Sequence, residues 1–161
     1  MLGARRDDRL EALVESIIAE GGAALYRVID VAGLVILALD QPGKLDVLIN
    51  SAGIAPISLF DDLCVEDWEA TIDVNIEGFL FGIVAALPVF RRQALGHFFN
   101  TLSTDRPSNR SDNVNLCRVE KRGQDNFRRA AQEAGPSIRM KGVSSGCVQT
   151  ELPSFMTNTA M

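Results

Sequence analysis

The sequence has few of the residues that build metal centres or disulfide frameworks, and no excess of positive charge. Its 161 residues include one histidine, His97, and three cysteines, which are too widely spaced to form a metal-ligand pattern. Unpaired thiols are typical of reducing compartments, so the sequence predicts a cytoplasmic protein without disulfides. A net charge of −5 argues against nucleic acid or an anionic membrane as a partner. We therefore expect no metal and no nucleic acid.

Long apolar runs are also missing. The longest uninterrupted one, residues 31–39, is far shorter than the ~20 residues that a membrane-spanning helix needs. The opening residues, MLGARRDDRL, contain no apolar core of the kind found in a secretory signal peptide. We therefore expect no contact with a membrane. A hydrophobic content of 47% and a charged content of 23% are ordinary for one globular domain of this length.

Helical and strand-like patterns alternate along the chain. Apolar residues recur every three to four positions in a helix that ends at Gly21 and Gly22, through residues 61–92, and through residues 116–133. Pro88 predicts a kink or an end in the second of these helices. Short apolar runs predict strands at 24–30, 45–50, 97–102 and 138–143, while 31–39 fits either a buried strand or a short helix. Such alternation predicts an α/β fold with a parallel sheet.

Small and polar residues follow three of the predicted strands. Asn50-Ser51-Ala52-Gly53 ends the apolar run LDVLI, Ser103 and Thr104 follow the next strand, and Ser144-Ser145-Gly146 follow the last. Ligands of parallel sheets bind where the carboxyl ends of the strands meet. Small residues let a flat ligand lie against the main chain, and an asparagine amide can brace a neighbouring strand. The pattern fits a binding crevice at this edge of the sheet. The alternative is that the three segments are unrelated loops, which would give the same spacing.

Several ordered motifs resemble those of the short-chain dehydrogenase/reductase family. NSAG at 50–53 is similar to the motif that ends the family's fourth strand, DVNIEG at 73–78 to one in its long helix, and GHFFNTLST at 96–104 to its fifth strand. The resemblance continues through EAGPSIRMKGVSSGCVQTEL at 133–152 and covers nearly all of the chain. It implies a Rossmann-like fold and an NAD(P)-dependent oxidoreductase that acts on a small carbonyl or alcohol substrate.

The resemblance assigns two catalytic roles. Ser103 would hydrogen-bond the substrate carbonyl, where negative charge grows during hydride transfer. Asn75 would hold a water molecule of the proton relay. Two structural readings stay open, with Asn75 as a helix-surface amide and Ser103 as the cap of a strand end.

The resemblance also implies a cofactor site for NADP, with NAD as the alternative. Arg5 and Arg6 fall where the family usually places an arginine against the 2′-phosphate of NADP. The remaining contacts that it implies are Asp30 at the adenine amino group, Asn50, Ala52 and Gly53 at the adenosine half, and Thr150 at the carboxamide.

The sequence departs from the family at the proton donor. The family's general-acid tyrosine, and the lysine four residues after it, align with Leu116 and Glu120. Leucine has no proton to give, and glutamate places a negative charge where the lysine's positive charge belongs. The only tyrosine in the chain, Tyr26, lies at the start of a predicted strand. We therefore expect ordinary ketone reduction to be impaired or absent.

A second departure concerns the sheet. Under the resemblance the sequence starts at the tail of the family's second strand, so the first strand and its glycine-rich phosphate loop have no counterpart, which weakens the expected cofactor binding. The family's strand order, 3-2-1-4-5-6-7, then leaves a gap between strands 24–30 and 45–50, unless they pair or another chain fills it. The expected architecture is α/β, an incomplete Rossmann-like parallel sheet with flanking helices, in one truncated dinucleotide-binding domain over residues 1–161.

Two functions follow from the resemblance. One is an impaired NADP-dependent oxidoreductase. The other is a non-catalytic module that binds or oligomerises, with helices 61–92 and 116–133 as the expected contact between copies. The residues do not identify the substrate.

Overall fold

Helices and strands alternate in the structure as the sequence predicts. The computed structural model describes residues 1–29, 44–56, 64–102 and 114–144, the side chains of 114–121 excepted. The segment 31–39, predicted as a strand or a helix, lies outside this part of the chain. The described elements are β1 (Leu2–Ala4), α1 (Asp7–Ala19), β2 (Tyr26–Val28), β3 (Val47–Asn50), α3 (Val65–Ile72), the π-helical turn η2 (Asp73–Glu77), α4 (Gly78–Gln93), β4 (Gly96–Leu102), α5 (Val114–Ala134) and β5 (Ile138–Ser144).

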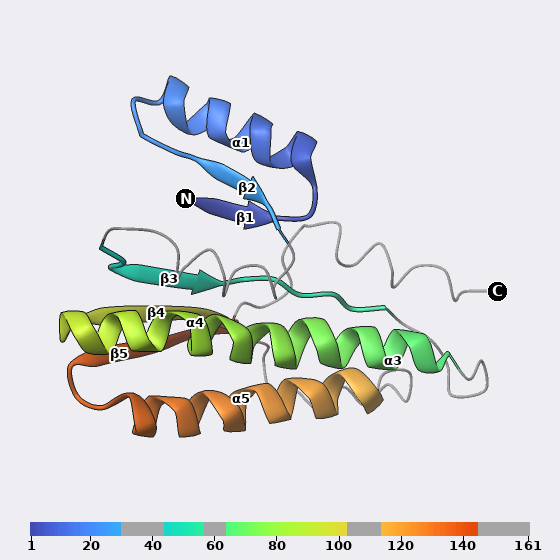
Figure 1. Ribbon diagram of the computed structural model, residues 1–161. Helices are drawn as coiled ribbons and strands as arrows, with labels where there is room; N and C mark the ends of the chain where they lie inside the picture. Colours follow the sequence, from blue (N-terminus) through green and yellow to red (C-terminus); the bar gives the residue numbers. More distant parts are fainter. Residues whose placement is uncertain (30–43, 57–63, 103–113, 145–161) are drawn as a thin grey trace.

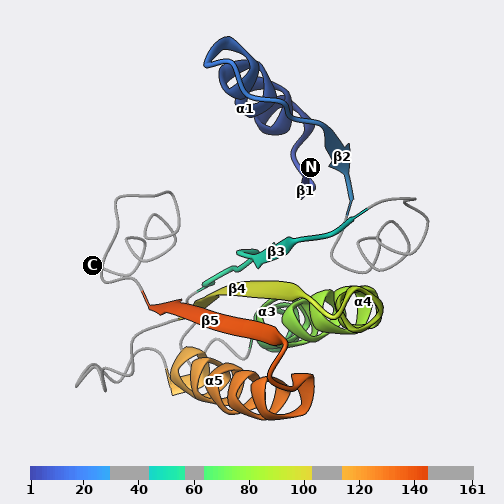
Figure 2. The ribbon, with the colours of Figure 1, turned by 90° about the vertical axis from the view of Figure 1, so that its left-hand side faces the viewer.

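The strands form two separate parallel sheets. β1 pairs with β2, and β4 lies between β3 and β5 in the second sheet. Helices α3, α4 and α5 lie on one face of the second sheet, while α1 lies against the first (Figures 1 and 2). No described strand joins the two sheets, so the gap expected between strands 24–30 and 45–50 is present in this part of the chain.

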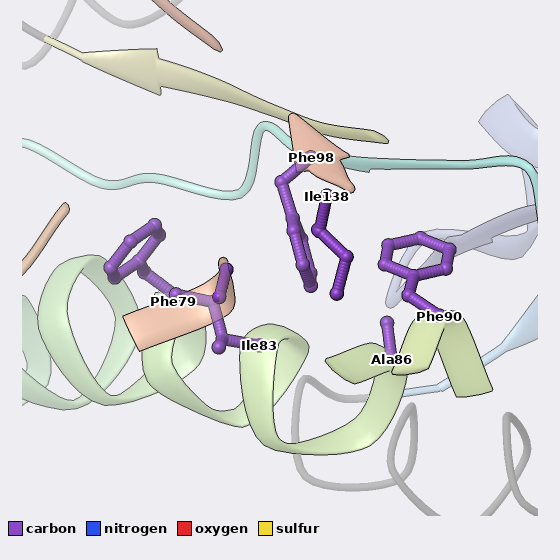
Figure 3. Close-up of a cluster of buried hydrophobic side chains, with 7 residues drawn as sticks. Phe79, Ile83, Ala86, Phe90, Phe98 and Ile138 are labelled. Carbon is purple, nitrogen blue, oxygen red and sulfur yellow. The ribbon is translucent and has the colours of Figure 1, made fainter. Parts of the chain in front are cut away.

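The hydrophobic core lies between α4 and the second sheet. Phe90 and Phe98 are fully buried and meet edge to face, with ring centroids 4.8 Å apart. Figure 3 shows Phe79, Ile83 and Phe90 projecting from α4 into the same cluster as Phe98 and Ile138. These α4 residues recur every three to four positions, so they form one stripe on the helix. Each buried phenylalanine or isoleucine contributes about 1.5–3 kcal/mol, which fixes α4 on β4 and β5.

The long helix predicted over residues 61–92 is one continuous rod from Val65 to Gln93 with a π-helical turn inside it. The prediction that Pro88 could end it is wrong, because α4 continues to Gln93. Proline lacks an N–H and therefore leaves the carbonyl four residues earlier, that of Val84, without its helical partner. Val84 is 62% exposed, so water can reach this side of the helix.

By length and composition alone, the rod Val65–Gln93 could cross a membrane. It is the only such helix in the part of the chain that the structure describes. Core helices pass the same test, and α4 buries Phe79, Ile83 and Phe90 against the sheet. The absence of membrane contact stays a prediction.

The unit β1–α1–β2 has little core of its own. Leu10 is the only residue of α1 that is buried, whereas Leu25 and Val28 beside it are 75% and 52% exposed. The helix ends at Ala19, and Gly21 adopts a φ of 86°, as the predicted glycine stop requires. A two-stranded sheet with so little burial is only marginally stable by itself.

Candidate functional site

Asn50 ends β3 and braces the sheet with its side-chain amide. Its Nδ2 donates a hydrogen bond of 2.8 Å to Oδ1 of Asn100, its register partner in β4. Asn100 is fully buried, and its own Nδ2 donates to the carbonyl oxygen of Lys141 in β5 at 3.5 Å. The two amides therefore link all three strands below the edge where the candidate site lies. Buried amides stabilise a fold only when such partners are present.

Gly82 of α4 leaves room for the Asn50 amide. A Cβ atom at Gly82 would overlap Oδ1 of Asn50, so only glycine lets the helix approach β3 this closely. The Asn50 side chain thus lies between the sheet and α4, and bracing is the role that its contacts show. Because the side chain is engaged in this way, the predicted adenosine contact of Asn50 would have to be made by its main chain. This contact remains a prediction.

Asn75 holds the loop that follows β3. Its Oδ1 accepts a 2.9 Å hydrogen bond from the N–H of Ile54, and its Nδ2 donates a 2.8 Å bond to the Ile54 carbonyl. Asn75 lies in the π-helical turn, and such turns often occur at functional sites. Each polar atom of the amide keeps one further hydrogen-bonding position, so the predicted water contact stays open. Asn75 is therefore more than a helix-surface amide, because its two hydrogen bonds with Ile54 hold the loop in place.

The main chain at Ala52 and Gly53 is accessible from the solvent. Both residues are exposed, and a Cβ at Gly53 would contact only Oδ1 of Asn75, at 3.6 Å. Beside them, the Thr101 hydroxyl donates to Oγ of Ser51 at 3.2 Å. The residues therefore fit a flat group laid against the backbone, with a fixed loop beneath it and hydroxyls at its side.

Arg5 and Arg6 lie between β1 and α1, at the carboxyl end of β1. β1 and β3 point the same way in Figure 1, so this arginine pair and the loop after Asn50 lie at the same edge of the two sheets. Both arginines are exposed, and Arg6 occupies the N-cap position of α1. Asp7 and Asp8 follow in the first turn, where they complement the helix dipole but oppose a bound phosphate.

The other predicted site residues fall where their side chains are not described. Asp30, Ser103 and Thr150 lie outside the described residues, so their roles stay predictions. Leu116 and Glu120 lie in the first turns of α5. This helix packs against the π-helical turn that carries Asn75, which places the family's proton-donor positions on the element next to the clamp.

Three residues that hold the site and its strand have no role in the sequence interpretation. Asn100 is the one amide in the strand HFFNTL, and Gly82 is a glycine inside a helix. Both are signals that could have been used, because each type is unfavourable at such a position unless a contact requires it. Gln93 is a third: its Nε2 donates to the Leu45 carbonyl at 2.7 Å and its Oε1 accepts from the Leu45 N–H at 3.0 Å. It fixes the chain at the entrance of β3 as Asn75 fixes the exit.

His97 has a structural place in β4. Its Nε2 is buried without a hydrogen-bond partner, and its ring lies 6.2 Å from that of Phe99, centroid to centroid. Burial lowers the pKa of His97, and the positive charges of Arg139 and Lys141 lower it further. Among the described residues no cluster of acidic, cysteine or histidine side chains could hold a metal ion.

A parallel α/β sheet with small residues at the carboxyl end of a strand defines a class, the Rossmann-like nucleotide-binding domains. Within that class, the chain belongs to the short-chain dehydrogenase family, because a sequence profile of that family matches residues 1–159. An uncharacterized oxidoreductase of Staphylococcus saprophyticus is 32% identical over the whole chain, which covers 68% of that relative. One from Listeria monocytogenes is 41% identical over 109 residues, 64% of this chain and 44% of its own.

Solved structures share the fold. A gluconate 5-dehydrogenase from Burkholderia cenocepacia, in complex with NADP and tartrate, matches 99% of this chain with a TM-score of 0.84 and 22% identity, over 66% of its own length. A metagenomic short-chain oxidoreductase in complex with NADP matches 96% of this chain with a TM-score of 0.82 and 24% identity, over 74% of its length. The predicted family and the predicted Rossmann-like fold are confirmed. The chain spans about two thirds of these proteins.

Proposed function

We propose that this chain is a short-chain oxidoreductase that binds NADP along β3 and is impaired in reducing carbonyl groups. The clamp from Asn75 to Ile54 is the observation that supports binding, because it holds Ala52 and Gly53 as a fixed, bare stretch of main chain. A preformed surface costs little entropy when a ligand settles on it. The NADP in the two structural neighbours supports the same cofactor for this chain.

The impairment follows from the two family positions in α5. A positioned general acid contributes roughly 10²–10⁴ in rate, and Leu116 cannot replace it. Glu120 adds a negative charge near an anionic cofactor in place of the lysine that would attract it. The substrate class, a small aldehyde, ketone or alcohol, rests on the family alone.

Binding can be tested by thermal unfolding with and without NADPH. A ligand at about 100 times its dissociation constant stabilises the folded state by ~2.7 kcal/mol, which corresponds to roughly 5–10 °C for a chain of this size. We expect Asn75→Ala to remove most of this shift, because the loop loses both hydrogen bonds that hold it. Gln93→Ala is the matched control, since it removes an equivalent pair of bonds at the other end of β3 and should keep the shift. Equal shifts in both variants, or none in the parent chain, would contradict the proposal.

Catalysis can be tested by following NADPH oxidation with a panel of small aldehydes and ketones. We expect the parent chain to show little or no turnover, and the double variant Leu116→Tyr/Glu120→Lys to gain it. The gain should approach the ~10² that a positioned acid contributes at minimum. Turnover in the parent chain that the double variant does not exceed would show that another group donates the proton.

A contact surface between copies is the second candidate function. Three apolar side chains on the outer side of the rod are exposed, Ile72 at 41%, Leu80 at 37% and Val84 at 62%. Exposed apolar residues on one helix favour docking to another protein surface, and self-association would cover them. We expect Val84→Glu to shift the sedimentation of the chain to a smaller species. A parent chain that sediments as a monomer at all concentrations would rule this function out.

A further inference from the structure

A pair of hydroxyl groups links the carboxyl end of β3 to β4. The Oγ1 atom of Thr101 donates a 3.2 Å hydrogen bond to Oγ of Ser51. Asn50 and Asn100 are register partners in the two parallel strands, so Ser51 and Thr101 are the next residues along the chain on each side. Both are exposed, so the pair lies at the surface of the candidate site.

The pair lies on the face of the sheet that is opposite to α4. The Asn100 side chain is fully buried and lies on the helix side together with the Asn50 amide. Successive side chains of a strand alternate between the two faces, so Thr101 projects from the other face, and its bond places the Ser51 hydroxyl there too. Val143, the register partner of Thr101 in β5, is 43% exposed. A ligand can therefore reach the two hydroxyl groups from the solvent.

The bond between the two side chains leaves one hydrogen for a ligand. A hydroxyl group has one hydrogen and two lone pairs, so two hydroxyl groups joined by one bond keep a single free hydrogen, whichever oxygen is the donor. With Thr101 as the donor, this hydrogen belongs to Ser51, whose side chain has no second partner within the described residues. A hydroxyl group that accepts a hydrogen bond is also polarised into a stronger donor.

Hydrogen bonds hold the main chain on both sides of Ser51. One residue before it, the Asn50 amide donates to Asn100 at 2.8 Å. Beyond it, the N–H and the C=O of Ile54 are both bonded to the amide of Asn75. The Ser51 hydroxyl is thus positioned before a ligand arrives, and a positioned donor loses little entropy on binding.

We propose that Ser51 donates its free hydrogen to the ribose–pyrophosphate part of NADP and that Thr101 orients the Ser51 hydroxyl, an inference that rests on the proposed function. A dinucleotide that lies on the main chain of Ala52 and Gly53 and continues toward β4 passes over this pair. The groups between its two bases are ribose and pyrophosphate. Phosphate oxygens only accept hydrogen bonds, so they are matched by a donor at this place. Ser51 is thus a ligand-binding residue, and Thr101 is a positioning residue.

Calorimetric titration of the full chain with NADPH tests this assignment. We expect Ser51→Ala to raise the dissociation constant about tenfold, through the loss of one hydrogen bond to a charged group. We expect Thr101→Val to raise it about threefold, because the Ser51 hydroxyl stays but is no longer oriented. Thr101→Ser, which restores the hydroxyl, should bind as the parent chain does. Ser16→Ala is the matched control, since it removes an exposed hydroxyl in α1.

The double variant separates the two roles. If Thr101 acts through Ser51, Ser51→Ala/Thr101→Val should bind NADPH as Ser51→Ala alone does. Losses that multiply in the double variant would mean that Thr101 contacts the cofactor itself, which would overturn the assignment. Thermal unfolding followed by circular dichroism should give these variants nearly the midpoint of the parent chain, because both side chains are exposed.

NADH identifies the part of the cofactor that Ser51 contacts. It shares the ribose–pyrophosphate part and lacks the 2′-phosphate, so Ser51→Ala should weaken the binding of NADH and NADPH by the same factor. A loss confined to NADPH would assign the hydrogen to the 2′-phosphate and overturn the inference. Unchanged binding of both cofactors by Ser51→Ala would overturn it as well, although NADPH binding by the parent chain would still support the proposed function. A parent chain that binds neither cofactor would contradict both.

Discussion

At the scale of single residues, hydrogen bonds from amide side chains hold the candidate site and the strand β3 in place. Asn75 holds Ile54, Asn50 reaches Asn100, and Gln93 holds Leu45. Each of these bonds joins segments far apart in the sequence and satisfies a main-chain or buried polar group that would otherwise cost about 1–3 kcal/mol. Gln93 thus fixes the entrance of β3, Asn50 fixes its end to β4, and Asn75 fixes the loop that follows.

The space that Asn50 occupies makes Gly82 a sensitive residue. We expect Gly82→Ala to destabilise the protein by about 1–3 kcal/mol, because the added methyl group displaces the Asn50 amide. Gly123→Ala is the matched control in another helix, where an added Cβ has no neighbour within 4 Å. It should stabilise the protein by about 0.5–1 kcal/mol through helix propensity. Urea unfolding of the two variants measures both effects, and equal changes in the two would contradict the packing assignment.

Tyr26 offers a second measurement at this scale, because it is the only tyrosine in the chain. Its hydroxyl group's hydrogen bond with Asp7 raises the pKa of Tyr26, and burial and the negative charges of Asp7, Glu11 and Glu15 raise it further. The folded state thus holds this proton more tightly than the unfolded chain, so its contribution to stability is complete below about pH 10 and is lost as pH rises through the folded pKa.

Near-ultraviolet absorbance against pH follows the phenol of Tyr26 directly. We expect its midpoint to lie above that of free tyrosine, and Asp7→Asn to move it back toward the free value. Asp8→Asn is the control, since Asp8 is the neighbouring carboxylate and takes no part in the shift. Identical midpoints in the two variants would remove Asp7 as the cause.

At the scale of elements, α1 and α4 differ in how much they bury. α4 has eight buried residues, whereas α1 has only Leu10. We expect the amides of α1 to exchange at least about tenfold faster than those in the middle of α4, because local opening of β1–α1–β2 exposes little apolar surface. Hydrogen exchange resolved along the chain measures this. Equal protection of the two helices would mean that the unit is held by contacts beyond those in the described residues.

The rod of α3, the π-helical turn and α4 is the element that connects core and site. Its α4 half packs Ile83 and Phe90 into the core, and its π-helical turn presents Asn75 to the loop. The same helix therefore packs on the sheet and fixes the position of the main chain beside Gly53, through the hydrogen bonds of Asn75 with Ile54. Pro88 does not interrupt this function, because the carbonyl that it leaves unpaired belongs to an exposed residue.

At the scale of the whole molecule, the second sheet carries the core and the first sheet carries Arg5 and Arg6. A cofactor that used both would bridge two bodies that share no paired strand in the described chain. Binding across them therefore depends on how the two sheets are held relative to one another.

The sequence by itself determined the family, the alternation of helices and strands, and the ends of most elements. Those properties depend on local periodicity and on ordered motifs such as NSAG and GHFFNTLST. Such patterns are visible in the sequence without knowledge of any tertiary contact. It also set the expectation of impaired catalysis, through Leu116 and Glu120.

Only the tertiary structure decided what the polar residues contact. The Asn50 side chain lies between β4 and α4, and the Asn75 side chain hydrogen-bonds the main chain of Ile54. The helix α4 continues past Pro88. Each outcome depends on a neighbour that is distant in sequence, such as Gly82 or Asn100, and on which side of a helix water can reach. The register of the strands has the same origin, because strand pairing joins residues whose proximity local sequence does not encode.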